Sequence, residues 1–237
     1  MTQIKEIDYT KVFVVIPAFN EEQSIAKVIN DIPFVPRKNI IVVNNGSTDS
    51  TQEMVESTGA TALFEPRKGY GWACLKGCEH VEKMNGETIV FLDGDYSDYP
   101  EQLPDVIAPI YEQNMDLVIG SRALGSREKG SMTVPQRFGN WLASKLLIIF
   151  YGVKYTDLGP FRAIRFESYK ELSMSDKTYG WTIEMQIKAA KKKMNYCEVS
   201  VDYKARIGQS KVSGTLKGAV MAGIKIIFAV FKYKFTE

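Results

Sequence analysis

Thr88-Ile89-Val90-Phe91-Leu92-Asp93-Gly94-Asp95 joins an apolar run to two carboxylates that lie one residue apart. The run is β-branched or apolar and follows Asn85-Gly86, so it predicts a buried strand that ends at the carboxylates. Two close carboxylates repel each other, and a cation between them is therefore expected. Mg²⁺ or Mn²⁺ suits oxygen ligands of this kind and usually takes further ligands from substrate phosphates. An Asp-x-Asp pair alone also occurs in turns and helix caps, so the rest of the sequence must decide whether this pair is a metal site.

Three other apolar stretches end in the same way, in a polar loop rich in turn-forming residues. They are residues 12–16, which lead into Pro17, residues 40–43, which lead into Asn44, and residues 61–64, which lead into Glu65. Helical segments separate most of these stretches, and we expect Asn20 to cap the helix after the first. Strands that alternate with helices predict an α/β fold with a mostly parallel central sheet and a ligand site along the carboxyl ends of the strands.

With these motifs in this order, the chain resembles the family 2 glycosyltransferases, whose catalytic domain has the GT-A nucleotide-diphospho-sugar transferase fold. The resemblance rests on residues 15–22, on residues 42–49, on the Gly69-x-Gly71 loop and on Asp93-x-Asp95. Within the family it looks most like the dolichyl- or polyprenyl-phosphate hexose synthases, through Ile119-Gly120-Ser121-Arg122 and the basic segment Arg206-Ile207-Gly208-Gln209-Ser210-Lys211.

The composition indicates one compact catalytic domain, which we expect over residues 1–215. The chain has 237 residues, of which 45% are hydrophobic and 24% charged, and its net charge of +2 gives no bulk attraction to nucleic acid. The N-terminal residues lack the apolar core of a signal peptide, and three cysteines with one histidine suggest a reducing compartment. We therefore expect a cytoplasmic protein.

Residues 216–237 interleave aliphatic and aromatic residues with lysines and predict a C-terminal amphipathic helix. Its uncharged runs are shorter than the roughly 20 apolar residues that a spanning helix needs. Two interpretations stay open: an interfacial helix at a membrane surface, which would make the protein peripheral on the cytoplasmic face, or a helix packed on the protein's own core.

The resemblance also implies which residues bind the nucleotide sugar. Base and ribose would be held by Pro17, Ala18, Asn20, Glu22, Asn44 and Ser47, and the phosphates by Lys68, Gly71, Asp93 and Lys211. Family members often have Asp-Asp where this chain has Asn44-Asn45, so the sequence does not identify the base of the nucleotide. UDP-glucose and GDP-mannose are the expected donors.

The acceptor side is predicted from charge. A phosphate monoester is already largely anionic at neutral pH, since its second pKa is about 6, and it needs cationic clamps rather than a base. By resemblance, Arg122, Arg137 and Arg206 bind this phosphate, with Lys211 as a further cation. We expect Asp157 to face the site. Glu184 either orients Arg122 or a sugar hydroxyl, or it lies in the first turn of a helix.

These features predict an inverting, metal-dependent glycosyltransferase that moves one hexose from a nucleotide diphosphate sugar to a polyprenyl phosphate, with Asp93 and Asp95 as metal ligands. Repeated transfer is not expected, because the Gln-x-x-Arg-Trp signature and the spanning helices of processive relatives are missing. One alternative is a soluble enzyme of the same fold with a hydroxyl acceptor, which needs a base such as Asp157 or Glu184. A sugar nucleotidyltransferase is another.

Overall fold

The computed structural model describes residues 6–208 and 216–235. Its strands are β1 (Val12–Ala18), β2 (Ile40–Asn44), β3 (Thr61–Phe64), β4 (Thr88–Phe91), β5 (Leu117–Ser121), β6 (Arg162–Arg165) and β7 (Tyr196–Ser200). Its helices are α1 (Ile25–Asp31), α2 (Thr51–Ser57), α3 (Tyr70–Lys83), α4 (Leu103–Glu112), α5 (Val134–Tyr151), α6 (Phe166–Leu172), α7 (Trp181–Lys191) and α8 (Leu216–Phe235). Short 3₁₀ turns lie at Tyr9–Lys11, Arg37–Asn39 and Pro100–Gln102.

The seven described strands form one sheet in the order β3-β2-β1-β4-β6-β5-β7. Strands β1 to β5 and β7 run in one direction, and only β6 runs against its neighbours β4 and β5. The predicted α/β fold with a mostly parallel sheet is confirmed. Because β6 is antiparallel, the loop before it reaches the same edge of the sheet as the loops after the other strands.

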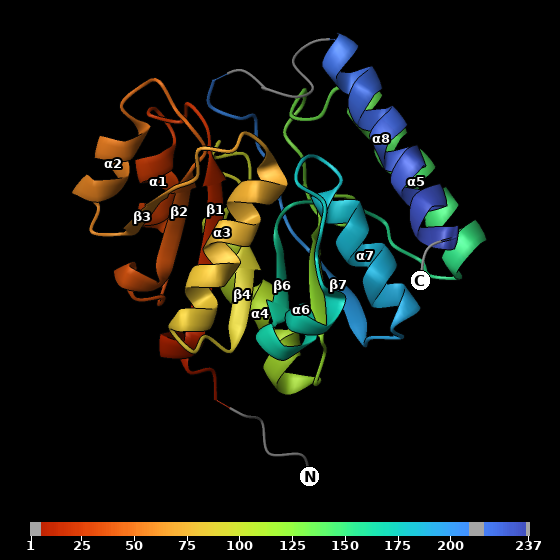
Figure 1. The fold of residues 1–237 in the computed structure, drawn as a ribbon, viewed down its shortest axis with the longest axis horizontal. Coiled ribbons are helices and arrows are strands. Elements are labelled where there is room, and N and C mark those ends of the chain that lie inside the picture. Colours follow the sequence, from red (N-terminus) through yellow and green to blue (C-terminus); the bar gives the residue numbers. More distant parts are fainter. Residues whose placement is uncertain (1–5, 209–215, 236–237) are drawn as a thin grey trace.

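Alternating side chains place the central strands between two apolar layers. Along β1, Val12, Val14 and Ile16 pack toward α1, α2 and α4. Phe13 and Val15 pack toward α3 and the other helices of the opposite face. This period of two is the pattern of a strand buried on both sides. Figure 1 shows the same arrangement, with α3, α6 and α7 in front of the sheet and α4 behind it.

The C-terminal helix α8 packs beside α5 and α7 (Figure 1). Its Ala229, Val230 and Tyr233 are buried in the core, and Phe231 meets the ring of Phe150 on α5 at a centroid distance of 5.1 Å. The helix therefore packs on the protein's own core along one face. Within residues 6–208 and 216–235, no helix is both long and apolar enough to cross a membrane.

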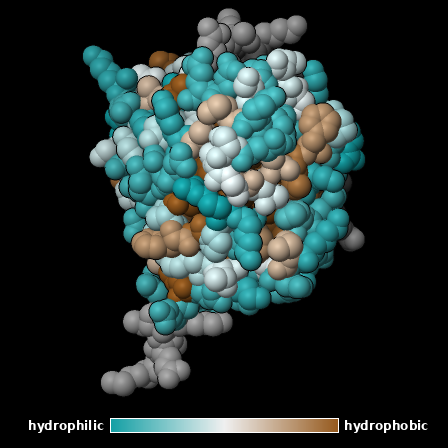
Figure 2. Space-filling model, turned by 90° about the vertical axis from the view of Figure 1, so that its left-hand side faces the viewer, coloured by the Kyte–Doolittle hydropathy of each residue, from teal (hydrophilic) through white to brown (hydrophobic). Residues whose placement is uncertain are grey.

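The outer faces of α5 and α8 expose large apolar side chains at helical spacing. These are Val134, Phe138, Trp141, Ile148 and Ile149 on α5, and Ile224, Phe228, Phe231 and Phe235 on α8. We call these nine residues the apolar surface. Lysines accompany them, among them Lys145 and Lys234, which are exposed. By contrast, the side of the molecule that carries α2 is mainly hydrophilic, with separated apolar patches (Figure 2).

Candidate active site

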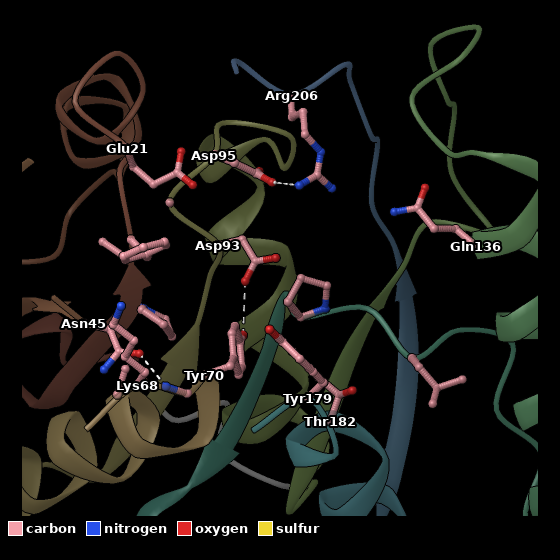
Figure 3. A pocket seen from close by; sticks show the side chains of 18 of the residues that line it. Glu21, Asn45, Lys68, Tyr70, Asp93, Asp95, Gln136, Tyr179, Thr182 and Arg206 are labelled. Atoms are coloured by element: carbon pink, nitrogen blue, oxygen red, sulfur yellow. Dashed lines mark hydrogen bonds and ion pairs between the residues drawn. The ribbon is translucent and has the colours of Figure 1, made fainter. Parts of the chain in front are cut away.

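One edge of the sheet gathers the loops that sequence analysis singled out. The loops after β1, β3, β4, β5 and β7 and the loop before β6 line a cavity of about 500 Å³ (Figure 3). Of the predicted site residues, seven line it: Pro17, Ala18, Lys68, Asp93, Asp95, Arg122 and Arg206. The cavity lies at the carboxyl ends of the parallel strands, where open α/β sheets bind their ligands.

Asp93 and Asp95 follow β4 and face the cavity (Figure 3). Burial and then the charge of Asp95 raise the pKa of Asp93 to about 7. The Tyr70 hydroxyl donates to Asp93 Oδ1 over 3.1 Å. Arg206 Nη1 lies 2.7 Å from Asp95 Oδ2, so a cation from the loop after β7 already compensates the second carboxylate.

Arg122 and Asp157 form a buried, two-point ion pair. Arg122 Nε donates to Asp157 Oδ2 and Nη2 to Oδ1, both over 2.7 Å, and the Arg122 backbone N–H also donates to Oδ2. Burial opposes ionisation of Asp157, but the Arg122 charge and these hydrogen bonds hold its pKa below the usual value. Asp157 therefore contacts the cavity residue Arg122 but does not line the cavity itself. The Arg122 guanidinium also lies 4.9 Å from the ring centre of Tyr203.

The two asparagines at the end of β2, its last residue Asn44 and the following Asn45, form hydrogen bonds within the protein through their amide groups. Asn45 Nδ2 donates to the carbonyls of Glu65 and Arg67, and its Oδ1 accepts from the Gly69 N–H over 2.7 Å. Asn44 Nδ2 donates to Gln52, and its Oδ1 accepts from the Ser47 N–H. These hydrogen bonds therefore hold the loops that follow β2 and β3 in place.

Asn20 and Glu22 lie beside the main cavity. With Asp49 and Gly208 they line a smaller one of about 130 Å³. The expectation that Asn20 caps the next helix is wrong: α1 begins at Ile25 with Ser24 before it, and the Asn20 side chain accepts from the Thr48 N–H. Asn20 also has a φ of 56°, outside the extended backbone typical of a cap residue.

Three further predicted residues, Ser47, Gly71 and Arg137, lie outside the cavity lining. Gly71 packs against the backbone of Asp176. Arg137 is exposed in the first turn of α5, next to the cavity residue Gln136. Lys211 lies outside the described residues.

Glu184 needs a correction. It lies in the first turn of α7, but its carboxylate accepts from the Ser175 and Asp176 N–H groups and from the Tyr233 hydroxyl. The Glu184 carboxylate is engaged by these partners, and the residue does not line the cavity.

Several cavity residues were not predicted from the sequence. Among them are Tyr70, Gln136, Tyr179 and Thr182 (Figure 3). Tyr70 had a signal, because it stands between the two glycines of the Gly69-x-Gly71 loop. Gln136 belongs to a capping box with Thr133 at the start of α5, which brings that end of the helix to the cavity.

The carboxylate pair fits a divalent cation that completes its shell from the substrate. Within the described part of the chain, no group of three or more His, Cys, Asp or Glu side chains is placed to hold a metal. Two carboxylates are nevertheless the usual protein contribution to an Mg²⁺ site that also takes substrate phosphates and water. Burial and the nearby Asp95 both raise the pKa of Asp93, so a bound cation would favour its charged form.

A mostly parallel sheet with an Asp-x-Asp pair at its carboxyl edge is the arrangement of the GT-A glycosyltransferases. The chain belongs to glycosyl transferase family 2, whose model matches residues 13–173. This membership sets aside the sugar nucleotidyltransferase alternative.

Relatives of similar length support the assignment. An uncharacterized glycosyltransferase of Mycobacterium tuberculosis (strain ATCC 25618 / H37Rv) is 33% identical over 214 residues, which cover 89% of this chain and 94% of that protein. The undecaprenyl-phosphate mannosyltransferase of Micrococcus luteus is 26% identical over 226 residues, or 90% and 92% of the two chains. The UDP-N-acetylglucosamine–dolichyl-phosphate N-acetylglucosaminyltransferase of Methanococcus voltae is 28% identical over 244 residues, or 94% and 96%.

Among solved structures, glucosyl-3-phosphoglycerate synthase of Mycobacterium tuberculosis in complex with Mn²⁺, UDP-glucose and phosphoglyceric acid superimposes with a TM-score of 0.75. The alignment covers 96% of this chain and 81% of that one at 21% identity, and it establishes the shared fold.

Proposed function

We propose that this glycosyltransferase moves a single hexose from a nucleotide diphosphate sugar to a polyprenyl phosphate at a membrane surface. The observation that carries the proposal is the pairing of two arginines with an apolar surface. Arg122 and Arg206 line the cavity beside the carboxylates, and α5, which reaches the cavity at Gln136, continues outward through the exposed Phe138 and Trp141. An anionic head group would thus meet guanidinium groups while its chain follows apolar side chains.

The donor would bind with its diphosphate near Asp93 and Asp95. Mg²⁺ or Mn²⁺ held by these carboxylates would supply Lewis-acid stabilisation of the leaving diphosphate. This support comes from the donor set and from the Mn²⁺ and Mg²⁺ complexes of glucosyl-3-phosphoglycerate synthase. Lys68, at the cavity wall in the glycine-bounded loop, adds a positive charge near the same diphosphate.

The chain's own residues favour a phosphate nucleophile. A phosphate oxygen would attack the anomeric carbon from the side opposite the diphosphate, so that the new C–O bond forms as the old one breaks and the configuration inverts. No proton has to be removed. A hydroxyl acceptor needs a base, but the two carboxylates expected for that role are engaged: Asp157 with Arg122, and Glu184 with the 175–176 segment.

Relatives of similar length that act on lipid phosphates give independent support. The names of the Micrococcus luteus and Methanococcus voltae enzymes specify undecaprenyl phosphate and dolichyl phosphate as acceptors. Glucosyl-3-phosphoglycerate synthase, by contrast, was solved with phosphoglyceric acid, which keeps a soluble acceptor as the competing outcome.

Label transfer tests the proposal. Purified enzyme receives radiolabelled UDP-glucose or GDP-mannose with Mg²⁺, together with a polyprenyl phosphate in detergent, 3-phosphoglycerate, or no acceptor. We expect counts in the butanol phase that require both metal and lipid. Label transferred only to 3-phosphoglycerate would contradict the lipid acceptor.

The arginine clamp is tested with Arg122→Lys rather than Arg122→Ala, because alanine would leave Asp157 buried without a partner charge. Lysine keeps the charge but loses the two-point geometry. We expect lipid-dependent turnover to fall at least about tenfold, equivalent to about 1.4 kcal/mol of barrier. The matched control is Arg127→Ala, an exposed arginine in the same loop, which should leave turnover within twofold.

A further inference from the structure

Glu184 is a fully buried carboxylate with an unusual number of donors around it. Its exposed fraction is 0%. Oε1 accepts from the Ser175 N–H over 2.9 Å, from the Ser175 hydroxyl over 2.6 Å and from the Tyr233 hydroxyl over 2.7 Å. Oε2 accepts from the Asp176 N–H over 2.7 Å, and Lys188 Nζ lies 2.8 Å from Oε1. Glu184 therefore fixes the backbone at residues 175–176 and joins it to α8.

The backbone of residues 176–177 packs directly against Gly69 and Gly71, beside the cavity. A Cβ atom on Gly71 would lie 2.1 Å from the Asp176 carbonyl oxygen, and one on Gly69 would lie 2.2 Å from that of Lys177. The Trp72 N–H donates to the Lys177 carbonyl over 3.2 Å. Contacts this close require glycine and leave residues 68–71 little freedom once residues 176–177 are fixed.

Lys68, Gly69 and Tyr70 of the same segment line the cavity, on the side where we propose that the nucleotide sugar binds. The other side of this segment is fixed by Asn45, which accepts from the Gly69 N–H. Residues 68–71 are thus held between β2 on one side and the segment that Glu184 fixes on the other.

We propose that Glu184 is a positioning residue for the nucleotide: through residues 175–177 it holds residues 68–71, the end of the loop after β3 and the start of α3, in the shape that binds the donor diphosphate. Tyr233 extends this connection to α8, the helix that carries four of the nine residues of the apolar surface. The inference rests on the proposed function only in that the cavity must bind a nucleotide diphosphate.

The test is nucleotide binding to Glu184→Gln. A glutamine of the same size keeps one acceptor but turns an NH₂ group toward donors, so the 175–177 segment should lose its anchor. UDP and GDP, each with Mg²⁺, are titrated by calorimetry into wild type and variant. For the nucleotide that wild type binds, we expect the Kd of Glu184→Gln to rise about tenfold, which corresponds to about 1.4 kcal/mol.

The control is Asp116→Asn. Asp116 also accepts from a backbone N–H, that of Asn195, and from a serine hydroxyl, that of Ser168, but it precedes β5 at the opposite edge of the sheet. Its loss should lower the melting temperature without changing the nucleotide Kd. In turnover assays, Glu184→Gln should raise the KM for the donor and leave kcat and the KM for the acceptor within twofold.

Milder variants decide the question if Glu184→Gln does not fold. Ser175→Ala and Tyr233→Phe each remove one hydroxyl from the network and should raise the nucleotide Kd about threefold. Folded variants that bind the nucleotide as tightly as wild type would overturn the positioning role and leave the proposed function intact. Wild type that binds neither UDP nor GDP would instead overturn the proposed function, and the inference with it.

Discussion

At the scale of single residues, the cavity-lining residue Asn45 shows how a polar side chain can hold several backbone segments of a site together. Its NH₂ group bridges the carbonyls of Glu65 and Arg67, and its oxygen holds the Gly69 N–H. The side chain is nearly buried, with 7% of its surface exposed. A carboxylate here would face two carbonyl oxygens with no proton to offer, which explains why asparagine fits this chain.

We predict that Asn45→Asp lowers the free energy of unfolding by about 1–3 kcal/mol, the usual cost of leaving buried polar groups without partners. Urea unfolding at neutral pH measures it. Asn85→Asp introduces the same charge at an exposed position and should change stability by less than about 0.5 kcal/mol. An Asn45→Asp enzyme that is as stable as wild type and binds UDP more tightly would show that this side chain reads the base after all.

Asp98 presents the opposite case, a carboxyl group whose two oxygens have no hydrogen-bond partner among the described residues. Burial, followed by the charge of Asp93, holds its pKa well above the usual value. The folded protein then binds a proton that the unfolded chain releases near pH 4. Stability is therefore lost as the pH rises from about 4 through the folded-state pKa.

We expect Asp98→Asn, which cannot ionise, to flatten this dependence. In urea unfolding with EDTA present, wild type should lose more stability than the variant between pH 5 and pH 8. Parallel curves for the two proteins over this interval would mean that Asp98 is charged in the folded state.

At the scale of elements, α5 links the cavity to the apolar surface. Its capping box at Thr133 and Gln136 fixes the first turn beside the cavity, and Phe138, Trp141 and Ile149 follow on its outer face. Burying one such side chain in lipid contributes about 1.5–3 kcal/mol.

We therefore predict that Phe138→Glu reduces co-sedimentation with anionic phospholipid vesicles at least about tenfold, since that energy range exceeds the 1.4 kcal/mol of one decade. UDP binding should be unchanged, because Phe138 does not line the cavity. Phe64→Glu is the matched control: Phe64 is 57% exposed against 60% for Phe138, but it ends β3. Equal vesicle binding by both variants would remove the membrane role of α5.

The elements also show what local sequence can and cannot predict. The first four strands were predictable, because each is an apolar run that ends in turn-forming residues. Strand β6 was not: Arg162-Ala163-Ile164-Arg165 is short and has charged ends, and it is a strand because β4 and β5 pair with it on both sides. The buried Arg162 guanidinium donates to the carbonyls of Gly159 and Thr182, partners that no spacing rule reveals.

The site follows the same division. Asp93, Asp95, Arg122 and Arg206 could be predicted to meet, because parallel strands bring their following loops to one edge. Glu184 could not be placed, because the direction in which a helix residue points depends on its neighbours. Here those are the 175–176 segment and Tyr233 on α8, which lies far along the chain.

At the scale of the whole molecule, the loops that line the cavity come from strands across the full width of the sheet, from β3 on one side to β7 on the other, so a bound ligand should hold the protein together. We expect UDP with Mg²⁺ at about 100 times its Kd to add about 2.7 kcal/mol of stability. For a chain of this size, that raises the melting temperature by about 5–10 °C. EDTA should abolish most of the shift. An equal shift with UDP and EDTA would contradict a metal at Asp93 and Asp95.

The position of β6 has a consequence for the order in which the molecule can be made. Strands β1 to β4 pair among themselves, but β5 and β7 join the sheet only through β6, which follows β5 in sequence. A ribosome must therefore release Arg165 before Arg122 can be brought beside Asp93 and Asp95. Until then, the emerging chain carries both carboxylates without the two arginines that face them. Newly made protein thus passes through a stage in which the loops after β1 to β4 can be in place while Arg122 and Arg206 are not, and the complete cavity must await the last third of translation.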